Sequence, residues 1–338
     1  MKVGIVGLSG YSGCELLKLL LNHKKVCVTY VAANTTTGKV SAIWPQLKAK
    51  TNLFCEKFNA NKAAAKCDIV FLAVPHTVSM KITPALISKG VRVIDLSGDY
   101  RLKNKNVYKT WYGKTHTDHK NLSKAVYGFP EIFRQKIKKA KLLSNPGCYP
   151  TGVLLGLIPI AATRTKSIQS IIIDAKSGTS GAGKKAKAEM VFSEVNESCK
   201  AYKVGNHQHT PEIEQYLSHI AGKNMQVTFV PHLLPINRGI LSTIYVKMEN
   251  GISLKQLHLI YKNFYKTEKF VRILPMGVQP EIKNVTHTNY CDIGLAIDKK
   301  KKMLIITSVI DNLVKGAAGQ AIQNMNIMCN FKEQEGLL

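Results

Sequence analysis

The chain has 338 residues, 45% of them hydrophobic, which is enough apolar material for a large buried core. This length favours two domains over one. No segment reaches the roughly 18 consecutive apolar residues that a bilayer-spanning helix needs, and the first residues form a strand pattern instead of a signal peptide. These features argue against a membrane protein and predict a globular, cytoplasmic one.

The formal net charge of +27 suggests a nucleic-acid-binding protein, because a basic surface attracts polyanions. Six of the 48 basic residues are arginines, so 48 − 6 = 42 are lysines, and they are spread thinly along the chain. Aromatic residues, on which nucleic-acid bases stack, make up only 7%. We therefore expect a solvated lysine surface and no nucleic-acid partner, with some attraction of phosphorylated substrates.

The eight cysteines are scattered, with no CxxC pair and no Cys/His spacing typical of a metal site. We expect free thiols and no bound metal. A functional cysteine must therefore be identified from its surroundings.

Strand and helix patterns alternate in the first half of the chain. In order, they cover 2–6 (strand), 12–22 (helix), 26–33 (strand), 67–74 (strand), 76–89 (helix) and 91–96 (strand). The run at 67–74 is almost continuously apolar, as in a strand covered on both faces. This alternation predicts an α/β domain with a Rossmann-type doubly wound parallel sheet.

The second half has longer strand patterns and predicts a second, α+β domain with a mixed sheet. The strand patterns cover 168–175, 226–230, 239–248, 293–297 and 303–310, and the helical ones 210–221 and 254–265. A last helix at 313–328 is expected to return to the first domain. The domains would then comprise residues 1–148 with 313–338, and residues 149–312.

A glycine-rich loop follows the first strand pattern and opens the first helix. Glycines there let the backbone turn tightly and approach a pyrophosphate, which binds the N–H groups of the helix start. We expect a dinucleotide to contact Gly7, Ser9, Gly10, Tyr11, Ser12 and Gly13. The spacing is GxxGxxG and not GxGxxG, so an ordinary tight turn is the alternative.

The segment after the second strand favours NADP over NAD. NAD sites commonly place a carboxylate there for the ribose 2′-hydroxyl, but residues 34–39 contain none. Thr36 and Lys39 are candidates to bind the 2′-phosphate. A polar surface loop would have the same composition.

Cys148 lies between the Pro146–Gly147 turn and a helical pattern at 151–162. The partial positive charge of a helix start favours a thiolate, so Cys148 is a candidate nucleophile. A structural cysteine before a helix is the alternative.

His207 and His209 directly precede the helix at 210–221, for which Thr210 is a fair N-cap and Pro211 a suitable first residue. Histidines in such a loop can act as acid or base, and Glu212 is available to orient one of them. Local capping and packing is the alternative. A zinc site would need further ligands, and the spacing offers none.

These residues together resemble the N-acetyl-gamma-glutamyl-phosphate reductase family, a relative of aspartate-semialdehyde dehydrogenase. The resemblance spans essentially the whole chain. In order, the matching motifs are GLSGYSG at 7–13, AVPH at 73–76, DLSGDYR at 95–101, YGFPE at 127–131, SNPGCYPT at 144–151, SGTSGAGK at 177–184, HQHTPEI at 207–213, FVPHLLPINRG at 229–239 and DNLVKGAAGQAIQ at 311–323.

The resemblance implies a reductase of arginine biosynthesis that converts N-acetyl-L-glutamyl 5-phosphate to its semialdehyde. Cys148 would attack the acyl phosphate, phosphate would leave, and NADPH would reduce the resulting thioester. His207 or His209 would transfer the proton, with His207 favoured. The resemblance also implies a homo-oligomer, a dimer or tetramer, with residues 149–312 as the catalytic and dimerisation domain and the rest binding the dinucleotide.

Further site residues follow from the same resemblance. Arg101 would bind the substrate phosphate, with an ion pair to Asp99 as the alternative, and Arg238 the glutamyl carboxylate. Asn145, with the backbone of Cys148, would stabilise an oxyanion. Glu212 would also bind the substrate. The nicotinamide end would contact Pro75, Ser177, Gly178, Gly181, Ala182 and Asn312. His76 and His232 match family motifs, but buried structural roles are at least as plausible.

Three alternatives remain open. A reductase of the same family could act on an aminoadipyl phosphate or on a substrate bound to a carrier protein, which the basic surface would suit. A nucleic-acid-binding protein would explain the charge more directly. An inactive relative is disfavoured by the presence of Cys148 and both histidines.

Overall fold

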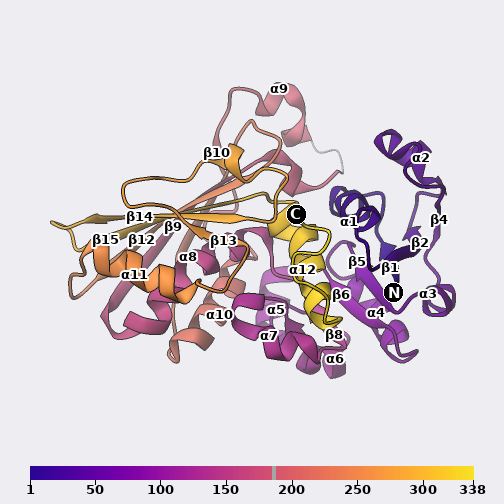
Figure 1. Cartoon of the computed structure of the whole chain (residues 1–338), viewed down its shortest axis with the longest axis horizontal. Coiled ribbons are helices and arrows are strands. Elements are labelled where there is room, and N and C mark those ends of the chain that lie inside the picture. Colours follow the sequence, from indigo (N-terminus) through magenta and orange to yellow (C-terminus); the bar gives the residue numbers. More distant parts are fainter. Residues whose placement is uncertain (185–187) are drawn as a thin grey trace. The chain divides into compact units, whose positions relative to one another are not determined.

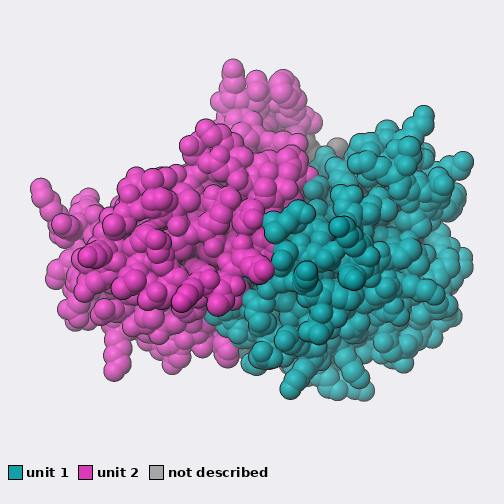
Figure 2. All heavy atoms as spheres, in the orientation of Figure 1, with its two compact units in different colours: residues 1–147, 317–338 teal, residues 148–316 magenta. Residues whose placement is uncertain are grey.

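The computed structural model describes residues 1–184 and 188–338. The chain divides into two compact units (Figure 2). Unit 1 comprises residues 1–147 and 317–338, and unit 2 comprises residues 148–316. Among the described residues, none of the helices combines the length and the apolar character needed to cross a bilayer.

Unit 1 contains an eight-stranded sheet with the strand order β3-β4-β2-β1-β5-β6-β8-β7 (Figure 1). All its pairings are parallel except that of β3 with β4. The strands are β1 (Lys2–Val6), β2 (Cys27–Ala33), β3 (Gly38–Lys39), β4 (Phe54–Lys57), β5 (Ile69–Leu72), β6 (Arg92–Asp95), β7 (Val126–Tyr127) and β8 (Leu142–Ser144). The order reverses at β1 and β5, the point where such sheets bind ligands.

Helices cover both faces of this sheet, because the crossovers run to opposite sides of β1. Helix α1 packs against α12, whereas α3 packs against α4. The helices are α1 (Tyr11–Leu21), α2 (Val40–Ile43), α3 (Ala60–Lys66), α4 (Ser79–Ile87), α5 (Lys105–Tyr112), α6 (His119–Lys124), α7 (Pro130–Lys138) and α12 (Gly319–Met328). All four residues of β5 are buried, as its apolar sequence predicts.

Unit 2 contains a mixed sheet of seven strands in the order β10-β11-β9-β12-β15-β14-β13. Its strands are β9 (Ile168–Ser177), β10 (Lys200–Ala201), β11 (Thr228–Leu233), β12 (Ile240–Met248), β13 (Val271–Ile273), β14 (Cys291–Asp298) and β15 (Met303–Ile310). Its helices are α8 (Cys148–Arg164), α9 (Phe192–Val195), α10 (Thr210–Ala221) and α11 (Leu254–Phe264), and a π-turn spans Val314–Ala318.

Helix α8 forms the centre of unit 2, with α10 and α11 packed beside it and one face of the sheet against it (Figure 1). Gly156 lets α8 approach closely, since a Cβ there would lie only 2.8 Å from Cδ1 of Ile244 on β12. On the opposite face of the sheet, Leu241, Thr243 and Tyr245 are only half-buried. One face of the sheet is therefore open within the unit.

The predicted fold class is confirmed, but some local expectations were wrong. Helix α8 begins at Cys148 and not at Thr151, because Pro150 falls in the first turn, where its missing N–H is not needed. Helix α10 begins at Thr210, so His209 and not Thr210 is the N-cap. Residues 313–328 do not form one regular helix, since the π-turn precedes α12.

Candidate active site

The glycine-rich loop joins β1 to α1 where the strand order of unit 1 reverses. Gly7 has a φ of 98°, and a Cβ there would lie 2.1 Å from the carbonyl oxygen of Ala73. A Cβ on Gly13 would lie 2.3 Å from the carbonyl oxygen of Gly7. Both positions therefore require glycine, whereas beside Gly10 a Cβ would meet only Gly7 O at 3.6 Å.

The start of α1 fits the pyrophosphate of a dinucleotide. Gly10 is the N-cap, so no side chain caps the first N–H groups of the helix. Ser9 and Ser12 are half-buried and Tyr11 is 36% exposed, so the loop lies at the surface of unit 1. An uncapped helix start after a parallel strand binds anions through its N–H groups and its dipole.

Trp44, which follows α2, stabilises this loop. Its indole Nε1 donates a hydrogen bond to the carbonyl oxygen of Leu8 at 2.8 Å, and its ring lies 6.3 Å from that of Tyr11. A Trp44→Phe variant keeps most of the buried ring but leaves Leu8 O without this donor. We expect it to weaken dinucleotide binding by about 3- to 10-fold, the effect of one net hydrogen bond, as measured by calorimetric titration. Trp111→Phe is the matched control, and unchanged affinity of Trp44→Phe would contradict this role.

Three other predicted cofactor contacts also lie outside the core of unit 1. Lys39, in the short strand β3, and Pro75, after β5, are exposed. Thr36 is half-buried and its carbonyl accepts a hydrogen bond from Sγ of Cys55 at 3.4 Å. Their side chains are therefore accessible from solvent at the ends of β2 and β5.

Two fully buried carboxylates stand at and just after the end of β6. Asp95 accepts hydrogen bonds from the backbone N–H and the hydroxyl of Ser97, both at 2.9 Å. Asp99 accepts from the N–H groups of Thr77 and Met80, at 2.7 and 3.0 Å, and from the hydroxyl of Tyr108 at 2.7 Å. Asp99 thus ties the loop after β5 to the loop after β6. Burial, and secondly the charge of Asp99, raise the pKa of Asp95 to about 7.

This raised pKa predicts a pH dependence of stability. Folded Asp95 binds its proton more tightly than the unfolded side chain, whose ordinary pKa is 3.8. The stability that the protonated carboxyl contributes to the folded state is therefore lost as pH rises from about 4 to about 7. Asp95→Asn does not titrate. Between about pH 4 and pH 7, we expect the free energy of unfolding of Asp95→Asn to rise by about 2–4 kcal/mol relative to that of wild type. Urea unfolding at several pH values measures this difference. Parallel pH profiles of the two proteins would contradict the burial of a titrating Asp95.

Arg101 is only 5% exposed and donates to two backbone carbonyls. Its Nε contacts the oxygen of Asn145 at 2.9 Å, and its Nη2 contacts that of Leu96 at 2.8 Å. These carbonyls follow β8 and β6, so the guanidinium is fixed at the carboxyl end of the parallel sheet. Backbone carbonyls after two neighbouring strands therefore orient the guanidinium.

Asn145 is also fully buried. Its Nδ2 donates to the carbonyl oxygen of Ala317 at 3.1 Å, and its Oδ1 accepts from Nδ2 of Asn324 at 3.2 Å. The amide thus binds the C-terminal segment of unit 1 to the end of β8.

Cys148, in unit 2, is half-buried at the first position of α8. The next residue, Tyr149, is almost fully buried and accepts a hydrogen bond from the hydroxyl of Tyr202 at 3.2 Å. Its own hydroxyl donates to the carbonyl oxygen of His232 at 3.3 Å. The first turn of α8 is therefore fixed by contacts with β11 and with the segment before α10.

His207 and His209 pack against this turn. Their rings lie 4.8 Å apart, and each meets the ring of Tyr149 edge-on, at 5.7 and 5.9 Å. Both are buried. The structure thus brings the two histidines and the first turn of α8 together, as the sequence prediction requires.

The protonation of His207 is set by its surroundings. Its Nδ1 accepts a hydrogen bond from the backbone N–H of His209 at 3.1 Å, so the neutral ring carries its proton on Nε2. Burial, and secondly the charge of Lys203, lower the pKa of His207 to about 4. His207 is therefore a neutral hydrogen-bond donor at physiological pH.

Arg238 and Asp311 form an ion pair of 3.1 Å in unit 2, in which the carboxylate is fully buried. The guanidinium of Arg238 is thus held by the carboxylate of Asp311, a pairing that the sequence did not predict.

Glu212 is fully buried in the first turn of α10.

The serine- and glycine-rich loop from Ser177 to Ala182 is firmly anchored, which argues against an ordinary flexible loop. A Cβ on Gly178 would lie 2.7 Å from the oxygen of Asn237, so the two segments approach closely. Asn312 connects them, because its Nδ2 donates to Oγ of Ser180 at 2.9 Å and its Oδ1 accepts from Gly239 N at 2.7 Å. Gly181 and Ala182 lie in the 3-10 turn that follows.

Neither His76 nor His232 is fully buried. His76 is exposed, although its Nδ1 accepts from the N–H of Gly98 at 2.8 Å. The His232 side chain is 24% exposed and lies 3.1 Å from Asp174. Sequence analysis also missed Tyr149 and Tyr202. Tyr149 was detectable as the residue after Cys148, but Tyr202 has no local signal.

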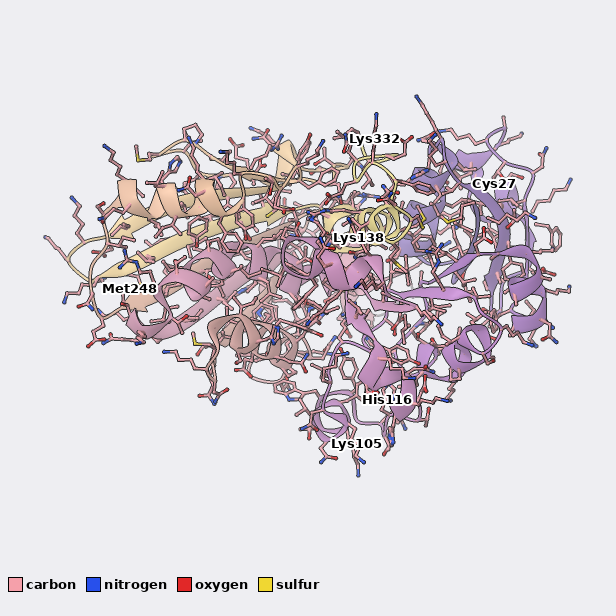
Figure 3. The ribbon with its side chains drawn as sticks, turned by 60° about the horizontal axis from the view of Figure 1, so that its bottom comes forward. Cys27, Lys105, His116, Lys138, Met248 and Lys332 are labelled. Atoms are coloured by element: carbon pink, nitrogen blue, oxygen red, sulfur yellow. The ribbon has the colours of Figure 1, made fainter. Side chains whose placement is uncertain are left out.

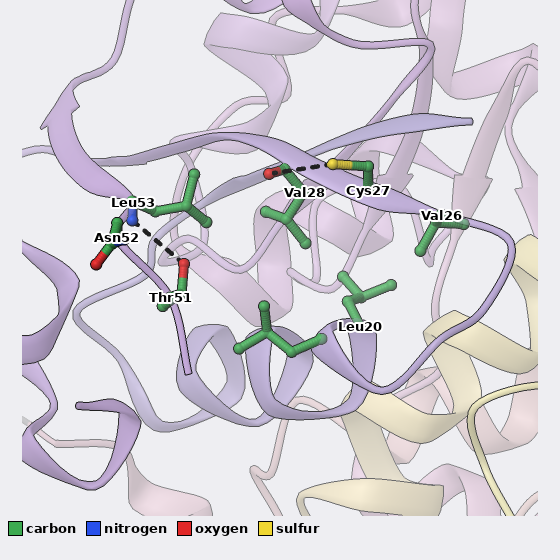
Figure 4. A pocket seen from close by; sticks show the side chains of 8 residues that line it. Leu20, Val26, Cys27, Val28, Thr51, Asn52 and Leu53 are labelled. Carbon is green, nitrogen blue, oxygen red and sulfur yellow. Dashed lines mark hydrogen bonds between the residues drawn. The ribbon is translucent and has the colours of Figure 1, made fainter. Parts of the chain in front are cut away.

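Other surface features lie apart from these residues. A groove of about 530 Å³ is lined by the C-terminal end of α1, the start of β2 and residues 51–53 (Figure 4), at the opposite end of α1 from the glycine-rich loop. Lysines on several elements are exposed, among them Lys105, Lys138 and Lys332, which are labelled in Figure 3. Within residues 1–184 and 188–338, His, Cys, Asp and Glu side chains form no group of three or more that could hold a metal ion.

Comparison with known proteins agrees with this division of the chain. Residues 2–140 match the semialdehyde dehydrogenase NAD-binding domain, and residues 148–312 match the semialdehyde dehydrogenase dimerisation domain. Over its whole length the chain is 50% identical to N-acetyl-gamma-glutamyl-phosphate reductase from Desulfotalea psychrophila, and the match covers 98% of that protein. It is 47% identical to N-acetyl-gamma-glutamyl-phosphate reductase from Clostridium beijerinckii, again with 98% of that protein covered.

Solved structures show the same fold. Aspartate semialdehyde dehydrogenase II from Vibrio cholerae, complexed with ASA, has a TM-score of 0.73 at 16% identity over 97% of this chain and 98% of its own. Aspartate semialdehyde dehydrogenase with NADP from Candida albicans has a TM-score of 0.73 at 14% identity over the same shares. Unit 1 therefore has the fold of a nicotinamide-dinucleotide-binding domain.

Proposed function

Because the chain belongs to the N-acetyl-gamma-glutamyl-phosphate reductase family, we propose that it reduces N-acetyl-L-glutamyl 5-phosphate to N-acetyl-L-glutamate 5-semialdehyde in the cytoplasm. Phosphate is released, and the reaction serves arginine biosynthesis. The observation that carries the proposal is Cys148 at the first position of α8, with His207 and His209 packed against the same helical turn.

Cys148 acts as the nucleophile. The positive end of the α8 dipole stabilises its thiolate. The sulfur attacks the carbonyl carbon of the acyl phosphate, the bond from that carbon to the phosphate oxygen breaks, and inorganic phosphate leaves with the electron pair. A thioester on Cys148 results.

His207 donates from Nε2 to the substrate oxygen, where negative charge develops. This donor needs no change of protonation, because the bond from His209 N–H already fixes the tautomer. After hydride has added to the thioester carbon, the oxygen electron pair re-forms the carbonyl and the carbon–sulfur bond breaks. The semialdehyde is released and the Cys148 thiolate is restored. His209, and Glu212 in the first turn of α10, are buried groups that relay a proton to His207.

NADPH, when bound, supplies the hydride that reduces the thioester. We assign its pyrophosphate to the loop from Gly7 to Gly13, where the uncapped start of α1 offers N–H groups. Thr36 and Lys39 take the 2′-phosphate, consistent with the lack of a carboxylate at 34–39. Pro75 in unit 1, and in unit 2 Asn312 with the loop from Ser177 to Ala182, are the residues that would bind the nicotinamide end.

The substrate contacts rest on buried polar groups. Arg101 is oriented by two carbonyls to receive the phosphate, and Arg238 is held by Asp311 to receive the carboxylate. Asn145 provides a further amide donor. A homo-oligomer, a dimer or tetramer, forms through the open face of the unit 2 sheet, where Leu241, Thr243 and Tyr245 are half-buried.

The deciding experiment is the reverse reaction, phosphate-dependent reduction of NADP by N-acetyl-L-glutamate semialdehyde. We expect activity that requires phosphate and prefers NADP to NAD. A folded protein without this activity would refute the substrate assignment. Activity only with an aminoadipyl semialdehyde or a carrier-bound semialdehyde would instead support a related reductase of the same family. The basic surface would suit an acidic carrier protein.

A further inference from the structure

Gly316, in the π-turn after β15, lies directly against Cys148. A Cβ built on Gly316 would lie 2.9 Å from Cβ of Cys148 and 3.3 Å from its Cα. Real Cβ atoms essentially never approach other atoms that closely, so any side chain at 316 would displace one of the two residues. The φ of Gly316 is not in the left-handed region, so glycine is required here by space and not by backbone conformation.

The π-turn is what brings Gly316 to this place. The N–H of Gly316 donates to the carbonyl oxygen of Asp311 at 2.9 Å, a bond that spans five residues and not the four of an α-helix. The wider turn enlarges the backbone locally, and such turns are rare and frequently lie at functional sites. A regular helix would carry a different residue towards Cys148.

Asp311 fixes the turn at its start. Its Oδ1 accepts from the N–H groups of Leu313 and Val314, at 2.7 and 3.0 Å, as a capping residue does. Its Oδ2 accepts from Nη1 of Arg238 at 3.1 Å and from the N–H of His287 at 2.7 Å. The carboxylate is fully buried, so the π-turn is anchored to two other segments of unit 2.

We propose that Asp311 and Gly316 are positioning residues for the Cys148 sulfur: Asp311 sets the π-turn, and Gly316 leaves the space that the cysteine occupies. The inference rests on the proposed role of Cys148 as nucleophile. Neither residue needs to contact the substrate, since both act on Cys148 through its position; Asp311 in addition holds Arg238.

The test is the rate of Cys148 alkylation by iodoacetamide, followed by peptide mass spectrometry over a range of pH. The exposed Cys199 in the same unit serves as internal reference. We expect Gly316→Ala to change the ratio of Cys148 to Cys199 alkylation at least about 5-fold and to lower kcat at least about 10-fold with little change in KM. The control is Gly251→Ala, because a Cβ at 251 meets no atom within 4 Å.

Asp311→Asn is the second variant, and it adds no atom near Cys148. Its amide nitrogen cannot accept hydrogen bonds, so the variant loses either the bonds from Leu313 and Val314 or those from Arg238 and His287. We expect the ratio of Cys148 to Cys199 alkylation to change in this variant as well, with Cys199 itself unaffected. Wild-type alkylation ratios and kcat in either folded variant would overturn the proposal. If the variants alter Cys148 alkylation but the wild-type protein does not turn over the acyl phosphate, the positioning role stands and only the proposed function is refuted.

Discussion

Cys148→Ala is expected to abolish reduction of the acyl phosphate, lowering kcat by at least about 10³-fold. The variant has no nucleophile, so no thioester can form. Its affinity for NADPH should be unchanged, because the proposed pyrophosphate contacts are backbone groups of unit 1. Steady-state turnover and a separate NADPH titration measure the two effects.

The covalent step can be observed directly. Wild-type protein mixed with the acyl phosphate in the absence of NADPH should gain the mass of the acyl group on the peptide that contains Cys148. Cys199→Ala, which removes an exposed thiol of the same unit, is the matched control and should react like wild type. Turnover by Cys148→Ala, or an acyl group on another residue, would refute the mechanism.

His207→Asn is expected to lower kcat by about 10²- to 10³-fold, the cost of removing one donor to a developing oxyanion. The exposed His219→Asn, on α10, is the control and should leave kcat near wild type. If His209→Asn lowered kcat far more than His207→Asn, His209 and not His207 would be the donor.

The pH profile tests the same assignment. Because burial lowers the pKa of His207 to about 4, its ring stays neutral over the ordinary working range. Protonation would occur at Nδ1 and break the bond from His209 N–H. We therefore expect no loss of kcat attributable to His207 above about pH 5. A loss with an apparent pKa near 6.5 that disappears in His207→Asn would contradict its buried, neutral state.

Elements defined by local patterns could be predicted from the sequence. The limits of β1 and β15 follow from short apolar runs, and the start of α1 follows from the glycines. Alternation of strands and helices was enough to predict the parallel sheet, because crossovers restrict the possible topologies. His207 and His209 were candidates for the acid or base from their position before a helix, and the resemblance to a family then implied their pairing with Cys148.

Contacts between distant residues could not be predicted in this way. The bond from Trp44 to the Leu8 carbonyl and the pairing of Arg238 with Asp311 depend on tertiary packing, which leaves no periodic signal. The π-turn was missed because Gly and Ala residues at 315–321 are compatible with a closely packed α-helix. It is the environment of Cys148, and not local propensity, that requires the wider turn at Gly316.

The discontinuity of unit 1 has a consequence for the order of folding during synthesis. Helix α12 and the residues after it contribute contacts across unit 1, including those from Asn324 to Gly128 O, from Arg92 to Met328 O and between His23 and Asn326. The ribosome makes these residues only after all of unit 2. Unit 2 is continuous and can fold as soon as it emerges. The dinucleotide-binding unit, although its first strand is made first, can complete its core only after unit 2 has been made.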